Sequence, residues 1–592
     1  WRVQTARHRE GWSAEFEIPY NAFRFSPQAD NRYEWGINFR RYISRKQETD
    51  EWVMVPSTER LLISKWGHLV GVANILPPMN LSFIPYISGT ASFESEAPGR
   101  PFRSDQRGHA GLDVKYGLSR DFTLDVAVNP DFGQVEVDQA ILNLTVFETF
   151  YPEKRPFFVE GASLFEFGSS VDNTPLGLFY SRRIGQRPRG SYSVAAPPGG
   201  RIESNPLVTT ILGAAKVTGH SASGFSLGLL SAATDEERAV LLDSARNEHK
   251  LRTEPRASYN VVRLKQEFGN SWLGAIATAA AYDNSLPALS GGFDWNVRLA
   301  DGAYTVDGYL AGARSSSPRS SSDGTTGRLL VSRIAAEHWF YTFSYQFATP
   351  RFNSNDLGFF NRPRYHGGYA QLLYRETKGE VLFRRYAFSI VPEVHWNWDG
   401  IRTLAQVEMV FTADWMNFWR STLKYTFNDR AYDDAERGVI GLYHRPRHHA
   451  LQLSVQTDER QVASVALTAD YKRDEQRKTS ISTLVGITLR PTSFLELTPL
   501  AYFERRRDEE TGVLFGGRIV TEGGMSMFAD RDVDEFDLAL RGTITLSRTV
   551  SIQFYSQLLL ARGRYRSHRL LVGEDTFVGV AMPPSYDFNY AI

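Results

Sequence analysis

The chain has 592 residues, of which 67 are Lys or Arg and 67 are Asp or Glu, so its formal net charge at pH 7 is zero. A neutral chain is not drawn to nucleic acid as a whole, and we expect no nucleic-acid partner. It contains no cysteine, which excludes disulfides, thiolate metal sites and cysteine nucleophiles.

Residues 1–75 form a first unit with the pattern of half-buried strands. Apolar and polar residues alternate over 12–18, and further strands are predicted over 33–43 and 51–55. A β-unit with so few strands is typical of the C-terminal part of a β-sandwich. The chain begins at Trp1 without a methionine or a signal peptide, so we expect it to be a fragment.

After Pro77-Pro78 the chain changes to longer alternating segments. Apolar and polar residues follow a period of two over 122–128, 451–456, 465–471 and 538–546. Segments of about 10 residues with this pattern match tilted strands that cross a membrane. Aromatic residues make up 13% of the chain, which suits the aromatic girdles of transmembrane barrels.

The connections between these segments are of two kinds. Short turns are predicted at 269–271, 300–302, 377–379, 491–493 and 548–549. Long polar loops are predicted at 232–256, 314–327, 348–366 and 428–447. Short turns on one rim and long loops on the other are typical of outer-membrane barrels. The sequence therefore predicts an all-β fold, with a large antiparallel transmembrane β-barrel of about 18 to 22 strands over 76–592 after a partial β-sandwich.

The alternative is a soluble all-β protein made of sandwiches. Strands of a soluble sandwich usually have about 5 to 6 residues, and the alternating segments here run longer. They also carry paired aromatic residues near their ends, as in 339–345 and 415–419. Both features favour the membrane barrel.

One block, residues 129–161, interrupts the alternation and is dense in charged and aromatic residues. Its apolar residues over 138–150 follow a helical spacing, so a helix is predicted there, ending before Pro152. We predict a non-alternating insert over 129–190 that folds into the lumen as a plug, because wide barrels are otherwise open.

The same block suggests how the plug is held. In this hypothesis Lys154 and Arg155 pair with acidic residues of the barrel wall, and Phe157 and Phe158 pack beneath them. The alternative is an insert held only by its own ion pairs, because structural ion-pair networks are common and resemble functional sites.

Two parts of the sequence resemble known families. Residues 11–19, 35–41 and Trp52 resemble the second half of a carbohydrate-binding family 9-like domain. Residues 129–138 and 152–161 resemble the most distinctive segment of DUF5916, a family of β-barrels from Gram-negative outer membranes. The resemblance implies an outer-membrane barrel preceded by a truncated carbohydrate-binding domain, here residues 1–75.

Both ends depart from the family pattern. The first half of the binding domain is absent, and the chain stops at Ile592, where one more hairpin and a terminal aromatic strand are expected. The residues that carry the barrel resemblance are Asn129, Asp131, Phe132, Glu136, Asp138, Asn143, Glu148, Glu153, Lys154, Arg155, Phe157, Phe158 and Glu160.

The first unit contains candidate sugar-binding residues. Trp12, Trp35 and Trp52 offer flat apolar faces for sugar rings, and Arg40 and Arg41 offer donors for hydroxyl groups. The alternative is that Trp12 is a core residue, since it alternates with glutamates along its strand.

Metal and catalytic signals are weak. Asp131, Glu136 and Asp138, together with Asn129, offer the hard oxygen ligands that Ca²⁺ prefers, but they lack the spacing of an EF-hand loop. No zinc-protease motif or phosphate-binding loop is present in the sequence. We therefore predict no catalytic residues, no resident metal and no cofactor.

The sequence thus predicts an outer-membrane protein of a Gram-negative bacterium that binds or takes up glycans at the cell surface. Its expected partners are outer-membrane lipid, a polysaccharide or oligosaccharide, and cell-envelope proteins that the sequence does not identify. The alternative is a secreted carbohydrate-active hydrolase or its binding module, with a glycoside hydrolase activity suggested by family association alone.

Overall fold

The structure is a computed structural model of the whole chain. It describes all residues except 21–22, 24, 26–29, 44–47, 55–65, 76–80, 96–101, 131–137, 169–176, 222, 284, 316–322, 380, 435–440, 516–517, 548, 581–585 and 592.

Within its described residues, the N-terminal unit contains three antiparallel strand pairs. The pairs are β1 (Arg2–His8) with β2 (Gly11–Glu17), β3 (Arg32–Ile37) with β6 (Gly67–Ala73), and β4 (Arg40–Ile43) with β5 (Glu48–Glu51). The strand predicted over 33–43 is interrupted at Asn38, whose side chain donates to Val53 O and accepts from Val53 N. These hydrogen bonds replace a strand ladder at that position.

Most of the remaining chain forms one antiparallel sheet of 24 strands among the described residues. The strands before the middle of the sheet are β7 (Leu81–Ser95), β8 (Phe102–Gly117), β9 (Phe122–Val128), β11 (Ile211–His220), β12 (Phe225–Thr234), β15 (Ala257–Phe268), β16 (Ser271–Tyr282), β17 (Ala288–Leu299), β18 (Tyr304–Arg314), β19 (Asp323–Arg333), β20 (Trp339–Ala348) and β21 (Tyr365–Glu376). The later strands are β22 (Phe383–Trp396), β23 (Arg402–Trp415), β24 (Arg420–Asn428), β27 (His448–Gln456), β28 (Ala463–Asp474), β29 (Thr479–Thr492), β30 (Leu495–Gly512), β33 (Thr521–Glu522), β34 (Met525–Thr545), β35 (Ser551–Gly573), β36 (Thr576–Gly579) and β37 (Phe588–Ala591).

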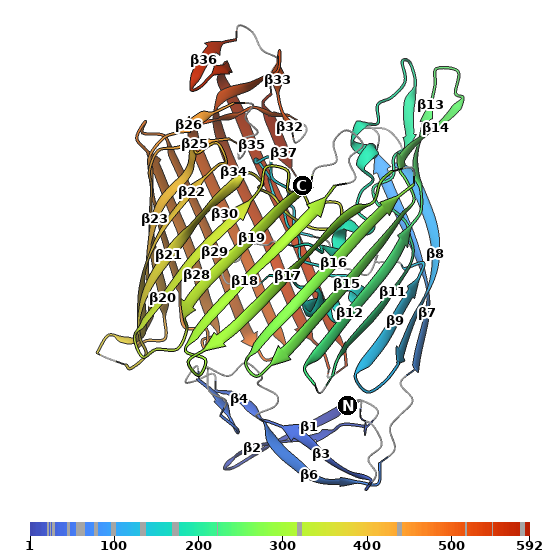
Figure 1. Cartoon of the computed structure of the whole chain (residues 1–592), viewed down its shortest axis with the longest axis vertical. Coiled ribbons are helices and arrows are strands. Elements are labelled where there is room, and N and C mark those ends of the chain that lie inside the picture. Colours follow the sequence, from blue (N-terminus) through green and yellow to red (C-terminus); the bar gives the residue numbers. More distant parts are fainter. Residues whose placement is uncertain are drawn as a thin grey trace.

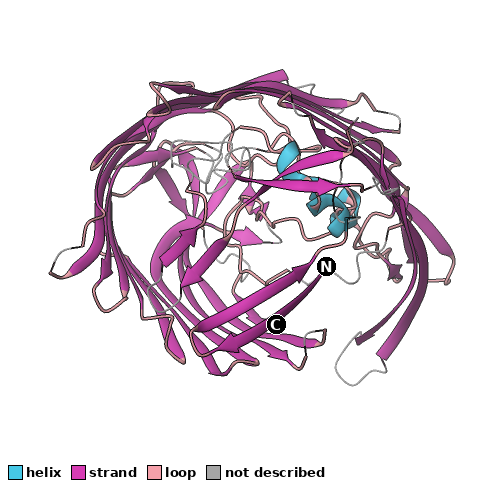
Figure 2. Ribbon diagram, turned by 90° about the horizontal axis from the view of Figure 1, so that it is seen from below, coloured by secondary structure: helices cyan, strands magenta, loops and turns pink. Residues whose placement is uncertain are grey.

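The sheet curls into a barrel, which Figure 2 shows as a ring seen from one end. Each strand from β7 through β35 is paired with the next strand of the sheet. In the order of neighbours around the barrel, β37 stands next to β7. Among the described residues, no residue-by-residue register joins β7 to β35 or β37. The count of 24 exceeds the predicted 18 to 22 because it includes β33, β36 and β37, which have four residues or fewer.

The two rims of the barrel differ as the sequence predicts. Tight turns such as Gly269-Asn270 and 300–303 lie at the end nearest the N-terminal unit (Figure 1). The opposite rim carries further strands in its long loops. They are β10 (Arg201–Ser204), β13 (Glu237–Leu242), β14 (Glu248–Glu254), β25 (Ala431–Asp433), β26 (Tyr443–Arg445), β31 (Leu514–Phe515) and β32 (Arg518–Ile519).

Alternate residues of the strands face out of the barrel and into its lumen. On β27, Leu451 and Leu453 are exposed on the outside. Between them, Gln452 points into the lumen and donates from Nε2 to Asp470 Oδ1 at 2.7 Å. This apolar-out, polar-in alternation confirms the predicted pattern. No helix within the described ranges is both long enough and apolar enough to cross a membrane.

The described residues of the block between β9 and β11 lie inside the ring (Figure 2). Its short helices are α1 (Pro156–Val159) and the 3₁₀ turns η4 (Ala162–Phe165), η5 (Ser181–Arg183) and η6 (Arg189–Ser193). The helix predicted over 138–150 is wrong, because that stretch is irregular. Asn143 causes this locally: its side chain accepts from Thr145 N and donates to Phe147 O, which replaces helical hydrogen bonding.

Candidate functional site: the insert and the lumen

The described residues of 151–193 (151–168 and 177–193), which we call the insert body, pack an apolar face onto the inner wall of β11–β18. The insert residues buried in this contact are Phe158, Phe165, Phe167, Leu178 and Ile184. Their neighbours on the wall include many small residues, among them Ala214, Ala232, Ala257, Ala280 and Ala311. A Cβ atom on Gly228 of β12 would lie only 2.9 Å from the Phe165 ring. Small wall residues therefore allow the insert body to approach the strands closely.

A buried lysine of the wall holds the end of α1. Lys216 of β11 donates from Nζ to Phe157 O and to Glu160 O, each at 2.6 Å. Its side chain is 1% exposed, and Asp125 of β9 lies 3.8 Å away. The carbonyl groups at a helix end lack partners within the helix, so this lysine satisfies them and fixes the insert body to the strand.

A second clamp joins the insert body to β15 and β17. Arg263 forms a two-point ion pair with Asp294 at 2.6 and 2.8 Å, and both side chains are almost fully buried. Asp294 Oδ2 also accepts from the backbone N of Gly168 at 3.0 Å. The pair is thus shared between the wall and the insert body, and removing one partner would leave a buried charge.

The loop between β20 and β21 folds into the lumen and holds the insert body from the other side. Gly177 forms an isolated bridge with Phe359. Tyr180 N donates to Leu357 O at 2.8 Å, and Arg183 Nε donates to Gly358 O at 2.9 Å. The insert body therefore lies between this loop and the wall.

The charged residues of the predicted block form ion pairs within the insert. Lys154 lies 3.2 Å from Asp138, and Arg155 pairs with Glu153 at 2.7 Å. The sequence hypothesis placed the partners of both cations on the wall, whereas these contacts lie inside the insert. Glu160, another member of the block, pairs with a wall residue, Lys115 of β8.

Two arginines that sequence reasoning missed complete the network. Arg182 forms a two-point contact with Asp138 at 2.5 and 3.0 Å, and Arg183 does the same with Glu148 at 2.8 and 2.7 Å. Both follow Ser181 directly in the sequence. The signal that could have identified them is a pair of adjacent arginines downstream of an acidic block. Guanidinium groups commonly pair with carboxylates at two points.

Glu153 is the carboxylate most enclosed by this network. Burial alone would raise its pKa, but hydrogen bonds from Arg155 and from the Ser181 hydroxyl hold the pKa below the ordinary 4.5. Arg155 also lies over the Phe158 ring, 4.3 Å from its centre. The aromatic and charged parts of the block therefore stabilise one another.

Residues 139–147, which we call the strap, are exposed or half-buried. The strap touches the opposite part of the wall at Gln557 of β35. Ala140 N donates to Gln557 Oε1 at 3.3 Å, and Gln557 Nε2 donates to Ala140 O at 3.2 Å. Gln557 is also held by Asp537 of β34. The strap thus joins the insert body to β35 by few contacts.

Two cavities flank the insert body. One of about 800 Å³ opens near the short turns, lined among others by Glu166, Lys265 and Arg298. Another of about 490 Å³ lies near the long loops, lined by Gln186, Arg189 and further polar residues. Most residues that line the two cavities carry polar side chains, whereas the contact between the insert body and the wall is apolar.

The inner wall of β22–β30 is lined by polar residues instead. Ser482 Oγ donates to Asp470 Oδ2 at 3.1 Å, Ser454 contacts Thr468 at 3.0 Å, and Gln406 Nε2 donates to Glu393 Oε2 at 2.7 Å. These side chains form rows across neighbouring strands, which present hydroxyl, amide and carboxylate groups to the lumen.

The candidate sugar-binding residues fall into two groups. Trp12 and Trp52 are exposed, at 56% and 62%. Arg41 lies over the Trp12 ring at 5.6 Å, and Arg40 pairs with Glu51. Trp35 instead contacts the rings of Tyr20, Phe23 and Phe25.

The calcium candidates are not brought together in the described part of the chain. Asp131 and Glu136 lie outside it, as does Phe132, and Asp138 is engaged by Arg182 and Lys154. Asn129 instead ends β9, with its side chain donating to Ala110 O at 2.7 Å. No group of three potential metal ligands occurs among the residues that the structure describes.

Comparison with known proteins gives one family. The sequence matches DUF5916, a domain of unknown function, over residues 77–590. No curated protein matches the sequence.

Among solved structures, the fold is similar to the ferric enterobactin receptor PfeA of Pseudomonas aeruginosa. Two mutants bound to enterobactin share 8% identity with this chain, cover 86% of it and 79% or 78% of their own length, and give TM-scores of 0.38 and 0.39. The receptor bound to BCV-L6 shares 8% identity, covers 88% of this chain and 80% of its own, and gives a TM-score of 0.39. Similarity at this level carries no inference about function.

Proposed function

The chain belongs to the DUF5916 family, and we propose that it is an outer-membrane β-barrel of a Gram-negative bacterium that passes a polar solute beside a fixed insert. The observation that carries this proposal is the exposed apolar outer face of strand after strand. Val262 and Leu264 of β15 and Leu451 and Leu453 of β27 all project outward and are exposed. A barrel whose outside is apolar and whose inside is polar is suited to a bilayer.

Aromatic clusters at both ends of the strands support the membrane location. Near the short turns, the ring of Trp339 contacts Tyr374 at 5.0 Å, and Phe383 contacts Trp415 at 4.8 Å. Near the long loops, the ring of His366 contacts Trp396 and Trp398. Trp and Tyr favour the interface between lipid and water, so two such levels suit a membrane-spanning band.

The passage that we propose runs between the insert and the polar wall of β22–β30. The insert body is fixed to β11–β18 by an apolar face and two buried clamps, so it narrows the lumen from one side. The opposite rows of hydroxyl and amide groups would replace the hydration of a polar solute. Short turns face the periplasm in such barrels, and the short turns lie at the end nearest the N-terminal unit, so we propose a periplasmic position for that unit.

We propose a saccharide as the solute, with the N-terminal unit as its periplasmic binding surface. Exposed Trp12 and Trp52 offer flat apolar faces, and Arg41 stands beside Trp12. Stacking on indole rings combined with nearby donors suits sugar rings. The support for this second function is the exposure of those two rings, and it does not depend on the barrel.

Conductance in planar bilayers tests the passage. Deletion of residues 131–160 removes the strap and α1, and we expect a larger single-channel conductance than in the parent chain. Heat-modifiable migration of both proteins first verifies that the barrels are assembled. An assembled deletion variant that conducts no more than the parent would show that the insert does not narrow the lumen.

Retention on immobilised polysaccharides tests the saccharide surface. We expect Trp12→Ala and Trp52→Ala to weaken retention while the barrel still assembles. Val70→Ala, at an exposed apolar residue of β6, serves as the matched control. If the parent chain is retained on no member of a broad glycan panel, the N-terminal unit is not a saccharide-binding surface.

A further inference from the structure

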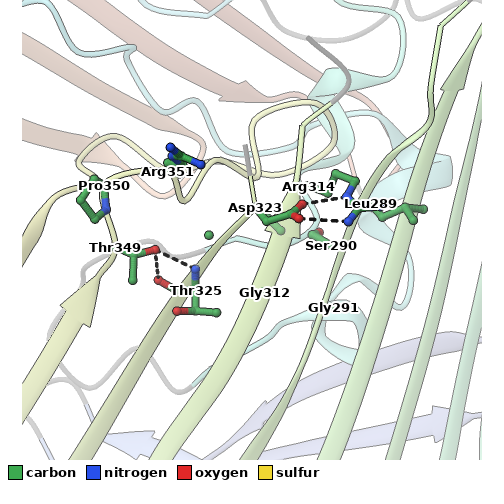
Figure 3. A pocket seen from close by; sticks show the side chains of 12 residues that line it. Leu289, Ser290, Gly291, Gly312, Arg314, Asp323, Thr325, Thr349, Pro350 and Arg351 are labelled. Carbon is green, nitrogen blue, oxygen red and sulfur yellow. Dashed lines mark hydrogen bonds and ion pairs between the residues drawn. The ribbon is translucent and has the colours of Figure 1, made fainter. Parts of the chain in front are cut away.

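A groove of about 650 Å³ lies on the wall of β17–β19, close to the long-loop rim (Figure 3). Its lining includes Leu289 and Gly291 of β17, Gly312 and Arg314 of β18, and Thr325 of β19. Pro350 and Arg351, which follow β20, form one side of it. The groove does not belong to the insert contacts or to the cavities inside the lumen.

The floor of this groove faces away from the lumen. Asp294 holds Gly168 of the insert body, so even-numbered residues of β17 point inward and Gly291 points outward. Ala311 and Ala313 belong to the buried core beneath the insert body, so Gly312 between them also points outward. Gly291 and Gly312 are direct partners across the two strands.

The hollow exists because these two partners have no side chains. On the side toward the middle of the strands, Phe293 and Leu310 project outward and are 68% and 53% exposed. A Cβ atom on Gly312 would find its nearest neighbour at 3.7 Å, so the space above it is open. An apolar chain lying there would fill a gap in the lipid-facing surface. It would also cover the apolar surface of Phe293 and Leu310, which favours binding.

The rim side of the groove carries positive charge. Arg314 pairs with Asp323 at 2.7 and 3.0 Å, which leaves that pair neutral. Arg351 is exposed and forms no hydrogen bond or ion pair with a described residue, although it lies near enough to Asp323 for its charge to act on that carboxylate. Thr349 and Thr325 hold this segment against β19 through a backbone bond and a hydroxyl bond. The groove is thus apolar toward the middle of the strands and cationic toward the rim.

We propose that this groove binds a phosphorylated membrane lipid of the leaflet at the long-loop rim. One acyl chain lies over Gly291 and Gly312, and the phosphate accepts hydrogen bonds from Arg351. This orientation is fixed because Gly291 is only three residues from the start of β17, about 10 Å along the strand, which matches the distance from a headgroup to the first part of its acyl chain. A basic residue beside an apolar groove recognises the headgroup as well as the chain. The proposal rests on the membrane location proposed above.

Lipid that remains bound to the purified full chain provides the test. The chain is reconstituted in bilayers of phosphatidylcholine with one fifth phosphatidylglycerol or lipopolysaccharide, extracted in mild detergent, and its bound lipids are counted by native mass spectrometry. We expect the anionic lipid to be enriched over its share of the bilayer. Arg351→Gln should lower that enrichment about fivefold, the factor expected for one cation at a membrane surface.

Gly312→Leu fills the hollow without altering charge, and we expect it to lower retention of both lipid classes. Arg364→Gln, at an exposed rim arginine outside the groove, and Ala469→Leu, on the outer face of β28, are the matched controls. Equal enrichment in parent, Arg351→Gln and Gly312→Leu would overturn the lipid site. A chain that fails to enter bilayers at all would instead overturn the proposed membrane function, so the two failures are distinguishable. Self-association of the parent chain through this face, abolished by Gly312→Leu without lipid enrichment, would also overturn the proposal.

Discussion

The two halves of the barrel wall have the same outer face and different inner faces. On β11–β18 the inward residues under the insert body are largely small or apolar, such as Ala232, Val261 and Ile276. On β22–β30 the inward residues are polar and hydrogen-bonded across strands, such as Gln452 and Ser454. The difference follows from what each half faces, because apolar residues are stabilised where protein covers them and polar residues are favoured where the wall faces water.

This contrast also separates two uses of charged residues. In the covered half, Lys216 and Arg263 are almost fully buried and connect the wall to the insert body. In the open half, Lys424 pairs with Glu408 while remaining 39% exposed. A buried pair cannot lose one partner without a large cost, whereas an exposed pair is supported by water.

The largest expected effect comes from breaking a clamp in the covered half. Arg263→Met leaves Asp294 buried without its partner, and we expect a loss of about 3 to 5 kcal/mol in the free energy of unfolding. Lys424→Met in the open half is the matched change, with an expected loss of about 1 kcal/mol or less. Urea unfolding in lipid vesicles measures both. Similar losses at the two positions would remove the distinction between the halves.

The next effect compares the outer and inner faces of one strand. Leu453→Arg places a cation in the lipid-facing band and is expected to cost about 2 to 4 kcal/mol. Gln452→Arg, one residue away, faces the open lumen and should be tolerated. Val261→Arg faces inward in the covered half, where it would displace the insert body, so it should not be tolerated. Equal tolerance of arginine at Leu453 and Gln452 would contradict the assignment of faces.

Much of the barrel could be predicted from the sequence, because a period of two directly reports which residues share a face. The alternation over 451–456 and 465–471 predicted β27 and β28, and the turn and loop lengths predicted the two rims. The burial of Phe158 was also predicted. The partners of Lys154 and Arg155 were not, because distant chain segments set them: Asp138 is shared with Arg182, some 44 positions away.

The clamps were missed for a different reason. Lys216 and Arg263 occupy inward positions on alternating strands, where a polar residue is the ordinary case. Only the fold shows that the insert covers Lys216 and Arg263 and does not cover Lys424. The prediction of a helix over 138–150 was wrong because the spacing of apolar residues does not report the hydrogen bonds of the Asn143 side chain, which compete with those of a helix.

Acidification should loosen the insert at a pH below the ordinary pKa of a glutamate side chain. The pKa of Glu153 is lowered in the folded state, so its contribution to insert stability is fully present above 4.5 and is lost as the pH falls through the lower folded value. We expect protease cleavage within 151–193 to increase at pH 3 relative to pH 6. Glu153→Gln should be cleaved more readily at pH 6 and should respond less to pH. An unchanged pH response in that variant would assign the effect to other carboxylates.

The smallest expected effect concerns the strap, which joins the covered half to β35. Gln557 makes two hydrogen bonds with the backbone of Ala140, and their loss should cost about 1 kcal/mol each at most. That change is too small to unfold the barrel, but it acts on a segment with few other contacts, so Gln557→Ala should increase opening events in single-channel records without changing the urea midpoint. Gln553→Ala, on the same face of β35 and without a recorded contact to the strap among the described residues, is the control. Because the chain has no cysteine, Ala140→Cys with Gln557→Cys can be joined by a short thiol-reactive linker. The joined protein should show fewer openings than the same variant before linkage. Openings that are equally frequent in the joined protein and in Gln557→Ala would show that the strap does not control the passage, and that the insert body alone sets its width.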